Sequence, residues 1–287
     1  MNKQVLETVI GCSVYNKDFV GTAELVNNLG GNFCQIFLSS PQSYVAPRHS
    51  DEELSALKQQ LLKYNIGIVI HGSFMLNFCN DQASSTHTKA VDLLVKDLND
   101  SVKLGAIGVI IHMGKRLEME EKTAIDNYVI GIKSVLKKSN QKSIIILETG
   151  AGCGSEVCTK ISELGNLYDR FTKEEQERIK FCIDTCHVYS AGYDLSNDHY
   201  IKIFDMMIDS HLSWDKVICI HLNDSKCKLD SRKDRHADLT TGYIKTDGLK
   251  KFVQLCHKKN IPMVLETPCD TELCFKKQID IVKDWIK

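Results

Sequence analysis

Six short apolar runs, spread along most of the chain, each end in a histidine or a carboxylate. The runs are rich in isoleucine and valine and too continuous to be one face of a surface helix, so they are typical of strands buried on both sides. Parallel strands that close into a barrel present all their carboxyl ends at one face. We therefore expect these side chains to converge there: His71, His112, Glu148, Asp184, His221 and Glu266.

Eight strand-like runs alternate with segments of helical period. The strands are predicted at 7–14, 33–39, 66–71, 107–112, 143–148, 178–184, 216–222 and 261–266. Segments such as 51–64 and 89–104 are apolar at three- and four-residue steps, as in amphipathic helices. Eight alternations favour a closed (β/α)8 TIM barrel over an open doubly wound sheet. Because no linker or composition break divides the chain, we expect a single domain over 1–287.

Composition weakens several classes of function. The formal net charge of -1 gives no global basic field, so a nucleic-acid partner would have to be held by local charge. No apolar segment approaches the ~20 residues that a membrane span needs, and we expect no membrane role. The twelve cysteines come without a secretory start, and several lie inside the apolar runs. They predict reduced, buried thiols and an intracellular, reducing compartment, either cytoplasm or nucleus.

Three further potential metal ligands, His187, Asp234 and His236, follow the ends of two of the runs. Five imidazoles and four carboxylates suit Zn²⁺, with Mn²⁺ or Fe²⁺ as substitutes. Nine ligands are too many for one ion, but they can serve two or three ions that share a bridging carboxylate. Three divalent ions would outweigh four carboxylates, so the site would attract a phosphate. Closely spaced metals are suited to phosphodiester cleavage.

Each of these side chains has a simpler explanation when taken alone. A histidine at a strand end is more often a hydrogen-bonded structural residue, and an aspartate or glutamate there can cap the next helix. Their coincidence at six consecutive strand ends is what favours a metal centre.

The segments around these residues resemble endonuclease IV, the zinc-dependent apurinic/apyrimidinic endonuclease family of base-excision repair. The matching segments follow the family's order: Ile70–Ser73, Ile111–Gly114, Leu147–Gly152, Cys182–His187, Ala191–Asp194, His221–Ser225, Asp234–His236 and Leu265–Pro268. Cys182–His187 and Asp234–His236 carry most of the specificity. The resemblance covers the chain from about Gly11 to the C-terminal helix.

The resemblance implies a trinuclear zinc site at the C-terminal face of the barrel. The first zinc would be held by His71, His112 and Glu148; the second by Glu148, Asp184, His221 and Glu266; the third by His187, Asp234 and His236. Glu148 would bridge the first two ions, and a metal-held hydroxide would attack the phosphate in line.

The implied substrate is double-stranded DNA that carries an abasic site or a blocked 3′ end. The expected reaction hydrolyses the phosphodiester 5′ to the abasic deoxyribose and leaves a 3′-hydroxyl and a 5′-deoxyribose phosphate. Trimming of blocked 3′ ends is a secondary expectation. Family membership also implies a monomer.

Family members select damage by inserting loop side chains into the duplex and flipping the abasic sugar out. The corresponding residues here are Gln42, Tyr44, Phe74, Met75 and Leu76. The apolar ones could instead belong to the core. In the basic loop 223–245, Arg235 stands between two expected ligands and is the best candidate for a contact to DNA phosphate.

The chain departs from the family's pattern in two loops. Thr240-Thr241-Gly242-Tyr243-Ile244-Lys245 stands where the family usually has Gly-Glu-Gly-x-Ile-Gly. This change removes a loop-ordering glutamate and adds bulk and positive charge beside the third metal. Gln42 stands where the family often has an arginine, so one cationic contact to DNA is missing.

Three other functions compete with the nuclease. Related barrels include sugar isomerases and epimerases, which generally use one or two metals and mostly carboxylates. A zinc-dependent phosphatase acting on small molecules would suit the same positive site. A zinc-storage or scaffold protein fits least, because structural zinc sites are usually closed and rich in thiolates. Three bound zinc ions would favour the nuclease over the isomerase.

Overall fold

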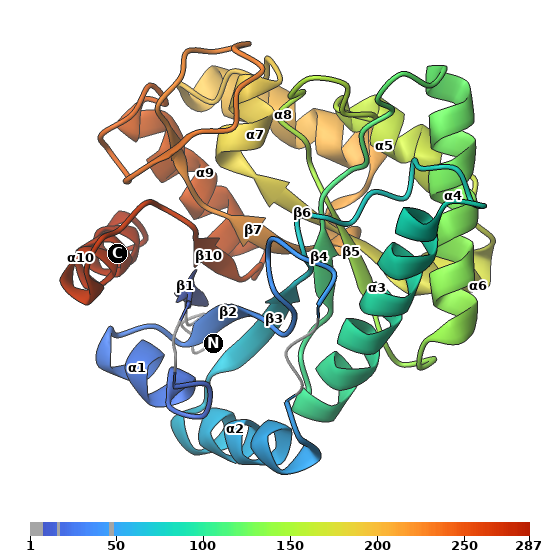
Figure 1. Cartoon of the computed structure of the whole chain (residues 1–287). Coiled ribbons are helices and arrows are strands. Elements are labelled where there is room, and N and C mark those ends of the chain that lie inside the picture. The colour runs from blue at the N-terminus through green and yellow to red at the C-terminus, as the bar shows by residue number, and fades with distance from the viewer. Residues whose placement is uncertain (1–7, 16–17, 46–48) are drawn as a thin grey trace.

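The computed structural model describes residues 8–15, 18–45 and 49–287. Eight parallel strands close into a barrel in the order β1-β10-β7-β6-β5-β4-β3-β2, and helices surround it (Figure 1). The predicted TIM barrel is therefore confirmed. The barrel strands are β1 (Ile10–Ser13), β2 (Phe33–Phe37), β3 (Gly67–His71), β4 (Val109–Ile111), β5 (Ile145–Glu148), β6 (Ile179–Asp184), β7 (Val217–His221) and β10 (Met263–Leu265). Residue 7, at the start of the first predicted strand, lies outside the described residues.

The helices include the segments predicted from the 3.6-residue period at 51–64 and 89–104. They are α1 (Thr22–Asn28), α2 (Asp51–Tyr64), α3 (Ser85–Leu104), α4 (Glu121–Lys138), α5 (Ile161–Tyr168), α6 (Lys173–Glu177), α7 (Thr185–Ser190), α8 (Asp198–His211), α9 (Thr246–Lys258) and α10 (Glu272–Trp285), with a short 3₁₀ turn, η1 (Trp214–Lys216). The long α3 buries Ala90, Leu94 and Leu98 at four-residue steps, which places one apolar face against the strands. No helix in the described part of the chain is long and apolar enough to cross a membrane.

The inside of the barrel holds a layer of buried, mostly apolar side chains, one from each of seven strands. They are Phe33, Val69, Ile110, Ile146, Cys182, Cys219 and Val264. Side chains alternate between the two faces of a strand, so a residue two positions further along points to the same side. Those seven positions carry Gln35, His71, His112, Glu148, Asp184, His221 and Glu266. The barrel thus directs a set of polar side chains into its open end, above an apolar floor.

A two-stranded antiparallel sheet, which the sequence analysis did not predict, folds the long loop after β7. Its strands are β8 (Asp224–Ser225) and β9 (His236–Ala237). The pairing turns the chain back toward the barrel, so that the segment 234–236 returns to the strand ends. Two residues per strand give no period to recognise, because such a ladder is set by tertiary contacts.

The cysteines correct one expectation. Ten of the twelve are free thiols, and eight of these are buried, but a disulfide joins Cys269 and Cys274. Cys269 follows β10 and Cys274 lies in the first turn of α10, which brings their Cα atoms within 5.5 Å. This distance is typical of disulfides. The prediction that all cysteines are reduced is therefore wrong for this pair in the structure.

One half-buried arginine ties two strand–helix units together. The Arg178 guanidinium donates to the carbonyl oxygens of Leu136 (2.7 Å), Asn140 (2.8 Å) and Ser143 (3.1 Å), near the end of α4 and the start of β5. It also reaches the hydroxyl of Ser139 at 2.8 Å. The Leu136 carbonyl lies in the last turn of α4, where the C=O groups of a helix have no partner within it.

Replacing Arg178 with lysine should therefore lower stability. An ammonium group can reach only some of these oxygens, and each lost hydrogen bond costs about 1 kcal/mol, so we expect a loss of roughly 2–3 kcal/mol. Chemical denaturation measures it. The matched control is Arg170→Lys, which touches an exposed ion pair with Asp126 and should cost less than about 1 kcal/mol. Equal losses in the two variants would contradict this role for Arg178.

Candidate metal centre

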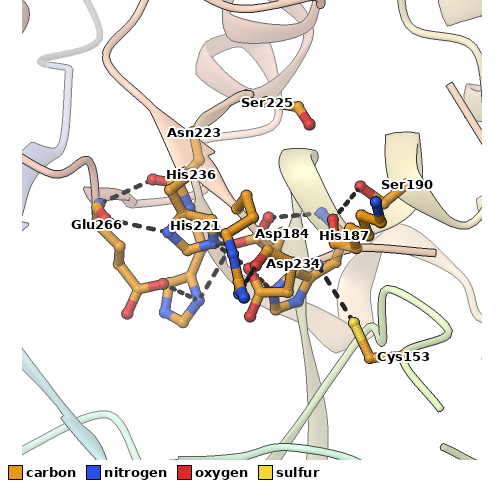
Figure 2. Close-up of polar contacts among 12 residues, drawn as sticks. Cys153, Asp184, His187, Ser190, His221, Asn223, Ser225, Asp234, His236 and Glu266 are labelled. Atoms are coloured by element: carbon orange, nitrogen blue, oxygen red, sulfur yellow. Dashed lines mark hydrogen bonds and ion pairs between the residues drawn. The ribbon is translucent and has the colours of Figure 1, made fainter. Parts of the chain in front are cut away.

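The structure brings all nine predicted side chains to one end of the barrel. His71, Glu148, Asp184 and His221 are the last residues of β3, β5, β6 and β7. His112 and Glu266 each follow a strand by one residue. The loop residues reach the same place, and Figure 2 shows Asp184, His187, His221, Asp234, His236 and Glu266 gathered from separate elements.

Glu148 lies in the middle of this cluster and is fully buried. Its Oε2 atom is 3.1 Å from Nε2 of His112 and 3.5 Å from Nε2 of His71. Its Oε1 atom is 2.8 Å from Nδ1 of His221 and 3.3 Å from Nδ1 of His187. One carboxylate thus faces two histidines with each of its oxygens, which is the geometry that a bridging ligand requires.

His221 connects Glu148 with the other two carboxylates of the predicted second group. Its Nδ1 atom lies 3.0 Å from Oε2 of Glu266 and 3.9 Å from Oδ2 of Asp184. The same Oδ2 atom of Asp184 is 3.5 Å from Nε2 of His236. Asp184 therefore stands between the second and the third predicted groups.

The third group is built from the loops. Nε2 of His187 and Nε2 of His236 both approach Oδ1 of Asp234, at 3.3 and 3.2 Å. His187 is held in place because its backbone N–H, in the first turn of α7, donates to Oδ1 of Asp184 at 2.8 Å. The amide of Asp234 is directed toward Sγ of Cys153 (Figure 2).

Backbone carbonyls select which nitrogen of three histidines faces the cluster. Nδ1–H of His71 donates to the carbonyl of Gly72 at 2.7 Å, and Nδ1–H of His187 donates to that of Thr149 at 2.8 Å. His236 does the same with the carbonyl of Glu266 at 3.1 Å. Each Nε2 atom is then left with a lone pair, as metal-binding histidines require.

Several buried polar atoms in the cluster have no hydrogen-bond partner within the described chain. They are Oε2 of Glu148 and Nε2 of both His187 and His236. A buried polar group without a partner is costly, so such atoms call for an explanation. All three belong to groups whose ligand atoms lie within 4.8 Å of one another. The residues present therefore fit metal ions.

The charged side chains of the cluster shift one another's pKa values strongly. Burial lowers the pKa of His221, but the charges of Glu266 and Glu148 outweigh it and raise the pKa to about 10. Burial opposes protonation of His236 too, yet Asp184 and Asp234 raise its pKa to about 9. Burial disfavours the Glu148 carboxylate, but the nearby histidines hold its pKa well below the usual range. The positive histidines and negative carboxylates of the cluster thus compensate one another.

Comparison with known proteins places the chain in a family. A model described as the xylose isomerase-like TIM barrel matches residues 23–287. A protein of Acanthamoeba polyphaga mimivirus that carries the name endonuclease 4 is 39% identical over 95% of this chain and 91% of its own length. One of that name from Mesoplasma florum is 32% identical over 93% and 92%.

The chain belongs to the endonuclease IV family. The crystal structure of endonuclease IV from Thermus thermophilus superposes with a TM-score of 0.82 at 28% identity, over 96% of this chain and 98% of that one. The predicted family resemblance is confirmed. The matches span nearly the whole length of both partners, so the nine side chains lie within the shared region.

Residues outside the predicted set hold the centre together. The side chain of Asn223, just after β7, donates to Oδ2 of Asp184 at 2.7 Å and accepts from the amide of Glu266 at 3.0 Å. Thr149 accepts from the amide of Asp184 at 3.0 Å. Gln35 contacts His221 and Glu266. Gln35 carried a signal that the sequence analysis missed, since it is the lone polar residue within the apolar run 33–38.

The residues predicted to touch DNA in this endonuclease IV-like chain lie in different settings. Gln42 is exposed, Tyr44 is half-buried, and Phe74 and Met75 are 48% and 43% exposed. Leu76 is buried in the core with 6% exposure but also lines the cavity beside the centre, so its contact with DNA stays a prediction. The hydroxyl of Tyr44 donates to the carbonyl of Met75 at 2.7 Å, so two of the predicted loops are joined.

A groove of about 510 Å³ adjoins the centre. It runs from Phe74 past His112 and His187 to Arg235. Arg235 is exposed, and its guanidinium donates to the carbonyl of Asp234 at 2.7 Å. The arrangement leaves one side of the cluster open to a ligand.

The loop 240–245, which lacks the glutamate that the family usually has there, is ordered by Asp224. The buried carboxylate of Asp224 accepts from the amides of Gly242 (2.8 Å) and Ile244 (2.9 Å). Thr240 adopts a positive φ of 72°, a conformation that favours glycine. Tyr243 is 51% exposed. The expected loss of loop order is therefore not seen, because Asp224 supplies the acceptors.

Zinc loading of the metal-free protein should release protons. Near pH 7, His221 and His236 hold protons because their pKa values lie above that pH, whereas a coordinating imidazole must be neutral. We expect more than one proton per chain to be released, and the zinc affinity to fall as the pH falls. Titration calorimetry in buffers of different ionisation enthalpy measures this. A binding heat independent of the buffer would contradict it.

Proposed function

We propose that this protein is a zinc-dependent apurinic/apyrimidinic endonuclease. It hydrolyses the phosphodiester 5′ to an abasic site in double-stranded DNA, and it also trims blocked 3′ ends. The observation that carries the proposal is the cluster of nine ligand-type side chains with unpaired Nε2 and carboxylate atoms, beside an open groove. The endonuclease IV relatives support the same activity.

Three zinc ions fit the three groups of side chains. His71, His112 and Glu148 would hold the first, and His187, Asp234 and His236 the third. Glu148, Asp184, His221 and Glu266 would hold the second. Bound zinc supplies Lewis acidity and positive charge, which are the requirements of phosphodiester hydrolysis.

The protein's own groups do the positioning. The carbonyls of Gly72, Thr149 and Glu266 fix three histidines in the tautomer that presents Nε2. Glu148 keeps its negative charge in a buried site and, facing four histidines, sets the spacing of the first two groups. Preorganised charges of this kind act on a phosphate without reorganising during the reaction.

Damaged DNA would enter through the groove. Phe74 packs edge-on against His71 (5.3 Å between ring centroids) and lies 5.4 Å from His112, so its exposed face borders the centre. Gln42, Tyr44 and Met75 would contribute to the same wall, and Arg235 would contact a phosphate. The protein would act as a monomer, as the family resemblance implies.

The decisive activity test uses a duplex with one abasic-site analogue and a matched undamaged duplex, without added magnesium. We expect cleavage confined to the 5′ side of the lesion, lost on removal of zinc and in Glu148→Gln. The control variant Glu175→Gln alters a carboxylate in α6 that accepts from the backbone amide of Thr172, outside the groove, and it should remain active. Zinc-loaded protein that cleaves neither duplex but hydrolyses small phosphate esters would contradict the proposal.

Replacing Phe74 with alanine should weaken binding of abasic DNA by roughly ten-fold. Stacking of an aromatic ring on a base is worth ~1–3 kcal/mol, and the variant loses that surface. Binding is compared with the wild type at one salt concentration, because affinity for DNA depends on salt. Zinc content should stay unchanged, and so should binding by the control Tyr200→Ala, an exposed aromatic on α8. An unchanged dissociation constant for Phe74→Ala removes it from the interface.

A further inference from the structure

Gln35 is a fully buried amide at the edge of the metal centre. It lies on β2, a strand that supplies none of the nine ligands. Its Oε1 atom is 2.7 Å from Nε2 of His221, and its Nε2 atom is 2.5 Å from Oε1 of Glu266. The same nitrogen is 3.3 Å from the hydroxyl of Ser13 on β1. One side chain therefore joins two members of the proposed second zinc group.

The charge of Glu266 determines which way the amide points. An ionised carboxylate only accepts hydrogen bonds, so the NH₂ end of Gln35 must face Glu266. The opposite orientation would place two oxygens against each other. The carbonyl end then faces His221, and a carbonyl only accepts. Nε2 of His221 must therefore carry a hydrogen, and in the neutral ring that a metal requires this leaves the lone pair on Nδ1.

Nδ1 of His221 is the atom that faces the carboxylates of Glu148 and Glu266, at 2.8 and 3.0 Å. His221 is thus inverted relative to His71, His187 and His236, which present Nε2 and are fixed by backbone carbonyls. The backbone cannot be removed by mutation, but Gln35 can. The tautomer of His221 therefore depends on the side chain of Gln35, which a substitution can remove.

We propose that Gln35 is a positioning residue that selects Nδ1 of His221 as a metal ligand and orients the carboxylate of Glu266 toward the same ion. The inference rests on the proposed metal centre and deepens it. Partners of this kind around a ligand typically change metal affinity by 10- to 100-fold when removed. The loss should fall on the second zinc group, since the other two groups do not contact Gln35.

The test compares two substitutions of Gln35 with a control. Gln35→Met keeps the volume but removes both hydrogen bonds. Gln35→Glu keeps an acceptor opposite Nε2 of His221. Gln176→Met removes another buried amide, bonded to the carbonyl of Tyr168 at 3.0 Å. Gln176 lies in α6, which precedes β6, and so stands at the opposite end of that strand from the centre. Zinc affinities are measured by chelator competition on the full chain, and the ring nitrogens of His221 are assigned by ¹⁵N NMR.

We expect Gln35→Met to bind one of three zinc ions about 10- to 100-fold more weakly. In the zinc-loaded variant, the ¹⁵N shifts of His221 should lose the pattern of a neutral ring whose Nε2 carries the hydrogen and whose Nδ1 binds the metal. Gln35→Glu should keep the wild-type pattern of His221 but also bind that zinc more weakly, because it places a second carboxylate against Glu266. Gln176→Met should match the wild type in both measurements. Neither readout uses DNA, so they stand apart from the test of nuclease activity.

Two results would overturn the inference. One is Gln35→Met binding all its zinc with wild-type affinity and an unchanged His221 spectrum. The other is equal weakening of every zinc site in Gln35→Met and in Gln176→Met, which would show a general loss of stability instead of a local role.

Discussion

The buried charge of Glu148 is the constraint on which the rest of this structure depends. A carboxylate at zero exposure in the mouth of a barrel is costly unless opposite charge surrounds it. Four histidines approach its two oxygens. Carbonyls of the loops after β3 and β5 accept from His71 and His187, and Gln35 on β2 accepts from His221. The polar side chains at the carboxyl end of the strands are thus arranged around one buried negative charge and the positive ions that would balance it.

The two-residue period of side chains along the strands brings the polar residues together around Glu148. Each polar strand-end residue stands two positions after a buried residue of the barrel interior, so that the floor is sealed while the next layer is polar. The loops then finish the centre. The β8–β9 pairing returns Asp234 and His236 to the strand ends, and Asn223 links the carboxylate of Asp184 to the backbone of Glu266. Rigid strands position most of the ligands, and the groove beside them is left for a substrate.

The sequence predicted the eight strands and the convergence of six strand-end side chains because both follow from local periodicity and strand direction. The grouping of the three loop residues His187, Asp234 and His236 came from the family resemblance. His71 or Glu148 can be placed at a strand end without knowing any tertiary contact. Gln35 was missed because a single glutamine within an apolar run looks like an interruption until its neighbours across the barrel are known. Leu76 was left between a DNA contact and a core position, because an apolar residue after a strand can turn either way, and it is buried. The Cys269–Cys274 disulfide depends on how α10 docks beside β10, which no local pattern specifies.

The most direct measurement is anomalous diffraction at the zinc absorption edge from crystals of the zinc-loaded protein. We predict three peaks: one enclosed by His71, His112 and Glu148, one by Glu148, Asp184, His221 and Glu266, and one by His187, Asp234 and His236. The middle peak should lie on the Nδ1 side of His221. A single peak, or peaks away from these side chains, for instance at Asp238, would contradict the proposed metal centre.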